Sequence, residues 1–147
     1  MVQGVPIVDN CLVNKNPATG QVISKVPCTP KDELDAMIQR SVQAQVAWSQ
    51  TPVETRVQLL RDGLQALSLQ STELAATIVS EMGKPLAEAV EEVGGAVDKK
   101  DFLDLLQTSL LPKQFGSCVV IRQALGVVAV LSPWNYPADE ILLLALP

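Results

Sequence analysis

The chain has 147 residues, the usual size of one folded domain, of which 48% are apolar and 18% are charged. This composition excludes a disordered acidic tail. Eleven basic and sixteen acidic residues give a net charge of −5, so we expect no binding of nucleic acid through phosphate neutralisation. Histidine is absent, which excludes Ser-His-Asp and Cys-His mechanisms within this chain and most zinc or haem sites.

The cysteines and the N-terminus indicate a reducing compartment. The three cysteines are widely spaced and form no Cys-x-x-Cys pair, so they are not a disulfide framework. Residues 1–6 lack the basic and apolar regions of a secretory signal. The most apolar stretch, residues 124–131, is too short to cross a bilayer as a helix. We therefore expect an intracellular protein that does not bind membranes, in the cytoplasm or, as an alternative that stays open, in an organelle.

The first 27 residues predict a short antiparallel hairpin. Residues 5–13 and 21–26 have the composition of strands, and residues 16–20 between them have the sequence Asn-Pro-Ala-Thr-Gly. Proline fixes φ and glycine tolerates positive φ, so this segment is a turn.

Four helices are predicted between residues 29 and 97 from apolar residues at helical spacing. Thr29 and Thr51 are expected to be the N-caps of the first two, each followed by proline at the first helical position. Gly83 is expected to end the third helix in a left-handed conformation, and Pro85 can open the fourth. The apolar stripes of the first three helices are Leu34, Met37, Ile38 and Val42; Val57, Leu60, Leu64 and Leu67; and Leu74, Ile78 and Met82. The stripe expected to be buried in the fourth helix is Leu86, Val90, Val93 and Val97.

After a further apolar segment at residues 102–111 and the breaker Pro112, the pattern changes from helix to strand. Residues 118–122 and 126–131 are rich in β-branched residues. The second run is nearly continuous in apolar residues, which is typical of a parallel strand covered on both faces. Such a strand needs neighbouring strands, and this chain has too few. We therefore interpret the C-terminus as a cut through a larger fold.

Residues 132–137 are the segment whose residue types most clearly indicate a functional site. In α/β sheets, ligands bind beyond the carboxyl ends of strands, where loops lead into helix N-termini. Asn135 lies there between Pro133 and Pro137, and its amide can donate to a developing oxyanion, an interaction worth roughly 3–4 kcal/mol in a preorganised site. The alternative is that Asn135 is only a cap or turn residue, and that Trp134 is an aromatic side chain of the core.

Four segments, in the same order, resemble motifs of the NAD(P)-dependent aldehyde dehydrogenase superfamily. The most specific is Leu-Gly-Val-Val-Ala-Val-Leu-Ser-Pro-Trp-Asn-Tyr-Pro at residues 125–137. The others are residues 16–20, the stretch with Trp48, Arg56 and Leu59-Leu60, and Glu-Met-Gly-Lys-Pro at residues 81–85 followed by Glu88-Ala89. The family usually has proline where this chain has Ala124, which makes the entry to the strand less rigid.

The resemblance implies the α/β class, as the N-terminal part of the aldehyde dehydrogenase fold. Residues 1–116 would form the hairpin and helices of the cofactor-binding domain. Residues 117–125 would form an oligomerisation hairpin strand, consistent with a homodimer or homotetramer of the full-length enzyme. Residues 126–147 would form the first strand of a Rossmann-like cofactor domain, the following loop and the start of the next helix.

The resemblance also implies oxidation of an aldehyde to a carboxylic acid with NAD or NADP, through a cysteine thiohemiacetal. Asn135 would be the catalytic residue that donates to the oxyanion, and Pro133 and Trp134 would line the cofactor cleft. The nucleophilic cysteine and general-base glutamate of the family have no counterpart here. We therefore interpret all three cysteines as ordinary thiols and expect the 147-residue chain alone to be inactive.

Two alternatives stay open beside this hypothesis. The residues themselves predict no metal site, but the family resemblance makes Asn14, Lys15 and Glu81 candidates for holding a monovalent cation. The simpler interpretation of Glu81 is a solvated acid at a helix end. The chain is also compatible with a catalytically inactive, truncated module that acts as a structural or interaction subunit, or with an incomplete sequence of a larger enzyme.

Overall fold

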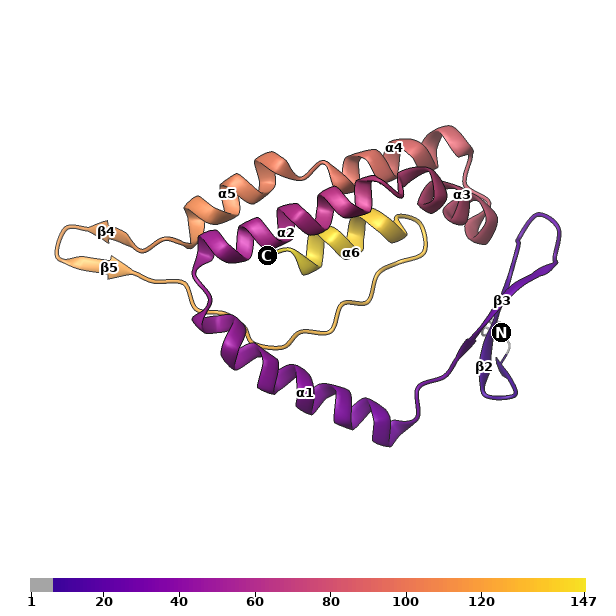
Figure 1. The fold of residues 1–147 in the computed structure, drawn as a ribbon, viewed down its shortest axis with the longest axis horizontal. Helices are drawn as coiled ribbons and strands as arrows, with labels where there is room; N and C mark the ends of the chain where they lie inside the picture. Colours follow the sequence, from indigo (N-terminus) through magenta and orange to yellow (C-terminus); the bar gives the residue numbers. More distant parts are fainter. Residues whose placement is uncertain (1–6) are drawn as a thin grey trace.

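The computed structural model describes residues 7–147. Residues 5 and 6 of the predicted strand 5–13 lie outside the described residues, as do residues 1–6, which were predicted to lack a secretory signal. Five strands and six helices follow one another along the described residues (Figure 1). The order is β1 (Ile7–Val8), β2 (Cys11–Lys15), β3 (Val22–Pro27), α1 (Lys31–Gln50), α2 (Val53–Ser68), α3 (Ser71–Met82), α4 (Leu86–Val97), α5 (Lys100–Leu110), β4 (Lys113–Phe115), β5 (Cys118–Val120) and α6 (Pro137–Ala145).

The predicted hairpin is confirmed, with one strand more than expected. β1, β2 and β3 form an antiparallel sheet in that order. The predicted strand 5–13 is interrupted because Asp9 and Asn10 have φ values of 54° and 57°, which is the conformation of a two-residue hairpin turn. In the turn between β2 and β3, the side-chain oxygen of Asn16 accepts hydrogen bonds from the backbone N–H groups of Ala18 and Thr19, at 2.9 and 3.1 Å.

The first two helices begin later than the sequence predicts. Pro30 and Pro52, rather than the threonines before them, are the N-cap residues of α1 and α2, and neither cap makes a side-chain hydrogen bond. The threonines lie one residue too early to reach the free N–H groups of the first turn. Thr51 Oγ1 instead donates to the carbonyl of Ala47 at 3.2 Å. The end of α3 is as predicted, with Gly83 at a φ of 74°.

Helix α1 is amphipathic but carries no buried residue. The predicted stripe Leu34, Met37, Ile38 and Val42 is between 44% and 49% exposed, so it is not buried against other parts of residues 7–147. Figure 1 shows why: α1 lies apart from the group formed by α2 to α6.

In the described part of the chain, no helix is long and apolar enough to cross a membrane.

The core lies among α2 to α6 and consists of two clusters. Val57, Leu64, Leu103 and Leu146 pack together where α2, α5 and the end of α6 meet, and Ala75, Ile78, Ala89 and Val93 pack between α3 and α4.

The buried face of α4 agrees with the predicted one only in part. Val93 is fully buried as predicted, whereas Leu86 and Val90 are more than half exposed and Ala89 is fully buried. A face with alanine suits this contact because a small side chain lets two helices approach closely. The predicted stripe contains only the larger aliphatic residues, so it includes Val93 but not Ala89, Glu92 and Ala96 of the buried face.

Residues 126–131 do not form the predicted strand. β4 and β5 pair as a two-stranded antiparallel hairpin, and all six of its residues are exposed. Beyond it, residues 121–131 have no sheet partner and lead back to α6 (Figure 1). A strand is defined by hydrogen bonds to a neighbour, and residues 7–147 supply no neighbour here.

The burial of side chains on α5 predicts that substitution of two of its leucines affects stability differently. Leu103 is 1% exposed and Leu105 is 64% exposed. We expect Leu103→Ala to lower the free energy of unfolding by about 2–5 kcal/mol, because it removes buried atoms and leaves a cavity. Leu105→Ala is the matched control and should change it by less than about 0.5 kcal/mol. Urea unfolding of the 147-residue chain measures both, and equal losses would contradict the assignment of the core.

Candidate active site

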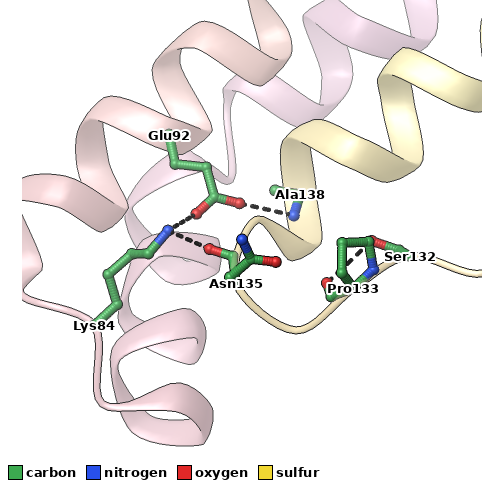
Figure 2. Close-up of polar contacts among 6 residues, drawn as sticks. All are labelled: Lys84, Glu92, Ser132, Pro133, Asn135 and Ala138. Atoms are coloured by element: carbon green, nitrogen blue, oxygen red, sulfur yellow. Dashed lines mark hydrogen bonds and ion pairs between the residues drawn. The ribbon is translucent and has the colours of Figure 1, made fainter.

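The loop that carries Asn135 is held against the junction of α3 and α4 (Figure 2). Lys84, between these helices, donates from Nζ to the main-chain carbonyl of Asn135 at 2.7 Å. The same Nζ lies 2.5 Å from Oε2 of Glu92 on α4. Oε1 of Glu92 accepts a hydrogen bond from the backbone N–H of Ala138 at 2.9 Å. Two residues of one ion pair therefore hold the chain on both sides of the Asn135–Pro137 segment.

This ion pair is largely removed from solvent. The Glu92 side chain is 1% exposed and that of Lys84 is 11% exposed. The ring of Tyr136 lies 4.1 Å from Lys84 Nζ, within the range of a cation–π interaction. The ammonium group thus contacts a carboxylate, a carbonyl and an aromatic ring, which compensate for the water that it loses on burial.

The side chain of Asn135 is exposed and forms no hydrogen bond with residues 7–147. Only its main-chain carbonyl is bound. The N-cap of α6 is Tyr136, and the acceptor for the Ala138 N–H is Glu92. The capping role that the sequence left open for Asn135 is therefore not present in this structure. Its amide group is available to a ligand at this surface.

Pro133 and Trp134 are also at the surface. Trp134 is 79% exposed, so it is not an aromatic side chain of the core. Its ring borders a groove of about 500 Å³ between α3 and α6, whose apolar lining includes Leu74, Ile78 and Ile141. Pro133 and Trp134 can supply apolar and main-chain contacts to one side of a cofactor cleft. No glycine-rich phosphate-binding loop accompanies them in the sequence.

Two of the three candidate cation ligands lie side by side. Asn14 Nδ2 donates to Oε1 of Glu81 at 2.7 Å and to the hydroxyl of Ser24 at 3.2 Å. Glu81 is exposed in the last turn of α3, as the interpretation of a solvated helix-end acid predicts, and it also accepts a hydrogen bond from this amide. Lys15 follows Asn14 at the end of β2, where the strand register is irregular. The described residues contain no group of three His, Cys, Asp or Glu side chains that could hold a metal ion.

The cysteines do not reach this loop. Cys11, Cys28 and Cys118 are free, and they belong to the two hairpin regions of the fold. None of them forms a hydrogen bond with residues 132–138. The polar residues beside Asn135 are therefore Lys84 and Glu92, neither of which the sequence analysis identified as functional.

A signal for Glu92 was present in the sequence. Ala89, Glu92, Val93 and Ala96 are the buried residues of α4, and they follow the i, i+3, i+4, i+7 spacing of one helix face. An acid at an apolar position of such a face is expected to have a buried partner. Lys84 is part of the Glu-Met-Gly-Lys-Pro motif at residues 81–85. Nothing in the local sequence joins it to residue 135.

Comparison with known proteins decides the family. The family model described as "Aldehyde dehydrogenase family" matches residues 8–145. The chain belongs to the aldehyde dehydrogenase family. Over 137 residues it is 33% identical to a succinate-semialdehyde dehydrogenase [NADP(+)] of Deinococcus radiodurans, covering 90% of this chain and 29% of the relative. It is 34% identical to a malonate-semialdehyde dehydrogenase of Bacillus cytotoxicus, covering 83% of this chain and 26% of the relative.

Solved structures of aldehyde dehydrogenases have the same fold in their N-terminal part. A succinate-semialdehyde dehydrogenase from Burkholderia pseudomallei superposes with a TM-score of 0.82 at 28% identity, covering 91% of this chain and 29% of that structure. An NADP-dependent glyceraldehyde-3-phosphate dehydrogenase from Bacillus halodurans, complexed with NADP, gives 0.82 at 27% identity, with coverage of 91% and 30%. The predicted α/β class and the family resemblance are confirmed. This aldehyde dehydrogenase chain spans between a quarter and a third of the length of these relatives.

Proposed function

We propose that residues 1–147 act as the N-terminal part of an NAD(P)-dependent aldehyde dehydrogenase that oxidises an aldehyde to a carboxylic acid. The observation that carries this proposal is the amide of Asn135, which is exposed and forms no hydrogen bond with residues 7–147. It lies on a loop whose main chain is held by hydrogen bonds to Lys84 and Glu92. A fixed donor of this kind stabilises negative charge that develops on an oxygen atom during a reaction.

In the proposed reaction, a cysteine thiolate that residues 1–147 do not supply attacks the aldehyde carbon, and the carbonyl oxygen becomes an oxyanion. Asn135 donates its amide N–H to that oxygen. Pro133 and Trp134 line one side of the cofactor cleft. Bound NAD or NADP would accept the hydride that leaves the aldehyde carbon. A water molecule, activated by a glutamate that residues 1–147 do not supply, would then release the carboxylic acid and the cysteine.

Assembly and location also belong to the proposal. The β4–β5 hairpin has six exposed residues and extends away from the helices (Figure 1), which supports residues 117–125 as the oligomerisation segment of a homodimer or homotetramer. The division into residues 1–116, 117–125 and 126–147 stays a prediction. A cytoplasmic location, and the absence of nucleic-acid and membrane partners, are likewise predictions from the sequence.

The activity test compares two proteins. We expect the isolated 147-residue chain to form no NADH or NADPH from an aldehyde, because it supplies neither the thiolate nor the general base. A full-length enzyme that contains these residues should form the reduced cofactor, measured by absorbance at saturating aldehyde. Aldehyde-dependent formation by the pure short chain, above a heat-inactivated control, would contradict the prediction.

A second candidate function is an inactive module that associates with another protein. The observation that favours it is the exposed apolar stripe of α1, which has no cover among residues 7–147. The intact mass of the protein in its source cell separates the two candidates. A species of 15.8 kDa supports the module, and a much heavier species that contains these residues supports the enzyme.

A further inference from the structure

We propose that Lys84 and Glu92 are positioning residues for Asn135, and that they aim its amide by fixing the main chain at its own carbonyl and at Ala138, three residues later. This inference rests on the proposed function of Asn135. It adds two residues that do not touch the aldehyde or the cofactor and that act only through the loop.

The first anchor is the hydrogen bond from Lys84 Nζ to the Asn135 carbonyl, at 2.7 Å. This carbonyl belongs to the peptide group between residues 135 and 136, so the bond fixes the plane of that group. The ring of Tyr136 lies 4.1 Å from the same Nζ. Lys84 therefore contacts two successive residues, and rotation of the Asn135–Tyr136 peptide would break its hydrogen bond to the carbonyl.

The second anchor is the hydrogen bond from the Ala138 N–H to Glu92 Oε1, at 2.9 Å. Ala138 is in the first turn of α6, where backbone N–H groups have no acceptor within the helix. The side chain of the N-cap residue Tyr136 supplies no hydrogen-bond acceptor to this turn. Glu92 supplies it from α4, and its negative charge is also favourable at a helix N-terminus. The start of α6 is thereby fixed to α4.

The two anchors act as one unit because Lys84 and Glu92 bind each other at 2.5 Å in a nearly buried site. The Asn135 side chain has no anchor of its own among the described residues. Its direction is consequently set by the main chain that these two residues hold. A shift of about 1 Å in a reacting group can cost about a hundredfold in rate, so loss of the anchor should reduce turnover.

The test uses a full-length enzyme that contains residues 1–147. We expect Lys84→Met to lower kcat by about tenfold or more, while KM for the aldehyde and Kd for the cofactor stay within about twofold, because the oxyanion donor acts on the transition state. Lys99→Met is the matched control. Lys99 also binds α6, through Asp139 at 2.6 Å, but it has no hydrogen bond to the Asn135 peptide. The kcat of the Lys99→Met variant should therefore stay within about twofold of that of the unaltered enzyme.

A double-mutant cycle separates positioning from a general structural role. If Lys84 acts through Asn135, Lys84→Met should cause no further loss of kcat in an Asn135→Ala background. An undiminished loss in that background, or an unchanged kcat in Lys84→Met alone, would overturn the inference. Failure of the proposed function is distinct, since Asn135→Ala would then leave kcat unchanged.

Two further measurements apply if Lys84→Met does not fold. Lys84→Arg keeps the ion pair but places a larger, planar group beside the carbonyl, and we expect a loss of kcat that disappears in the Asn135→Ala background. Hydrogen exchange of the Ala138 N–H in the unaltered chain requires no variant. Protection from exchange supports the second anchor, and exchange at the rate of an unstructured amide overturns it.

Discussion

Asn135→Ala is expected to lower kcat of a full-length enzyme containing this chain by about a hundredfold or more. The physical reason is that the amide meets an oxyanion that exists only after the thiolate has attacked. It therefore contributes little to binding of the aldehyde or of the cofactor, whose Kd should change little. Steady-state kinetics and cofactor titration measure the two effects separately.

Asn135→Asp distinguishes this role from helix capping. Aspartate has nearly the shape of asparagine, but a carboxylate repels an oxyanion and has no amide proton to donate, so we expect turnover at least as low as that of Asn135→Ala. A helix cap would behave differently: aspartate caps as well as asparagine does, and alanine would cost about 1 kcal/mol of stability. An Asp variant with near-normal turnover would contradict the oxyanion role.

Glu92→Ala is expected to lower the free energy of unfolding of the 147-residue chain by about 3–5 kcal/mol. The substitution leaves the ammonium group of Lys84, which is 11% exposed, without its counterion. It also leaves the backbone N–H of Ala138 without an acceptor, and an unsatisfied buried donor adds to the cost. Urea unfolding followed by circular dichroism measures the change.

Glu91→Ala is the matched control for this substitution. Glu91 precedes Glu92 on α4 but is exposed, so its replacement should change the free energy of unfolding by no more than about 0.5 kcal/mol. The double variant with Lys84→Met and Glu92→Leu should regain much of the lost stability, because apolar residues of similar volume often replace a buried ion pair without loss. Equal effects at positions 91 and 92 would contradict the burial of the pair.

The sequence by itself determined the features that depend on residues a few positions apart. The turn at residues 16–20, the left-handed Gly83 and the existence of the helices follow from local conformational preferences, which the rest of the fold does not alter. The family also followed from local motifs, above all residues 125–137. The position of Asn135 before α6 was predicted on the same basis, whereas its catalytic role stays a prediction.

Only the tertiary structure decided which faces are covered and which groups meet. The α1 stripe is apolar by its spacing, but its burial requires a partner that residues 7–147 do not supply. The segment 126–131 has strand-forming residues, yet a strand exists only when a neighbour completes its hydrogen bonds. Lys84 and Asn135 are 51 positions apart, and no local preference links them. The packing of α3 on α4, and of α6 on α4, brings them together.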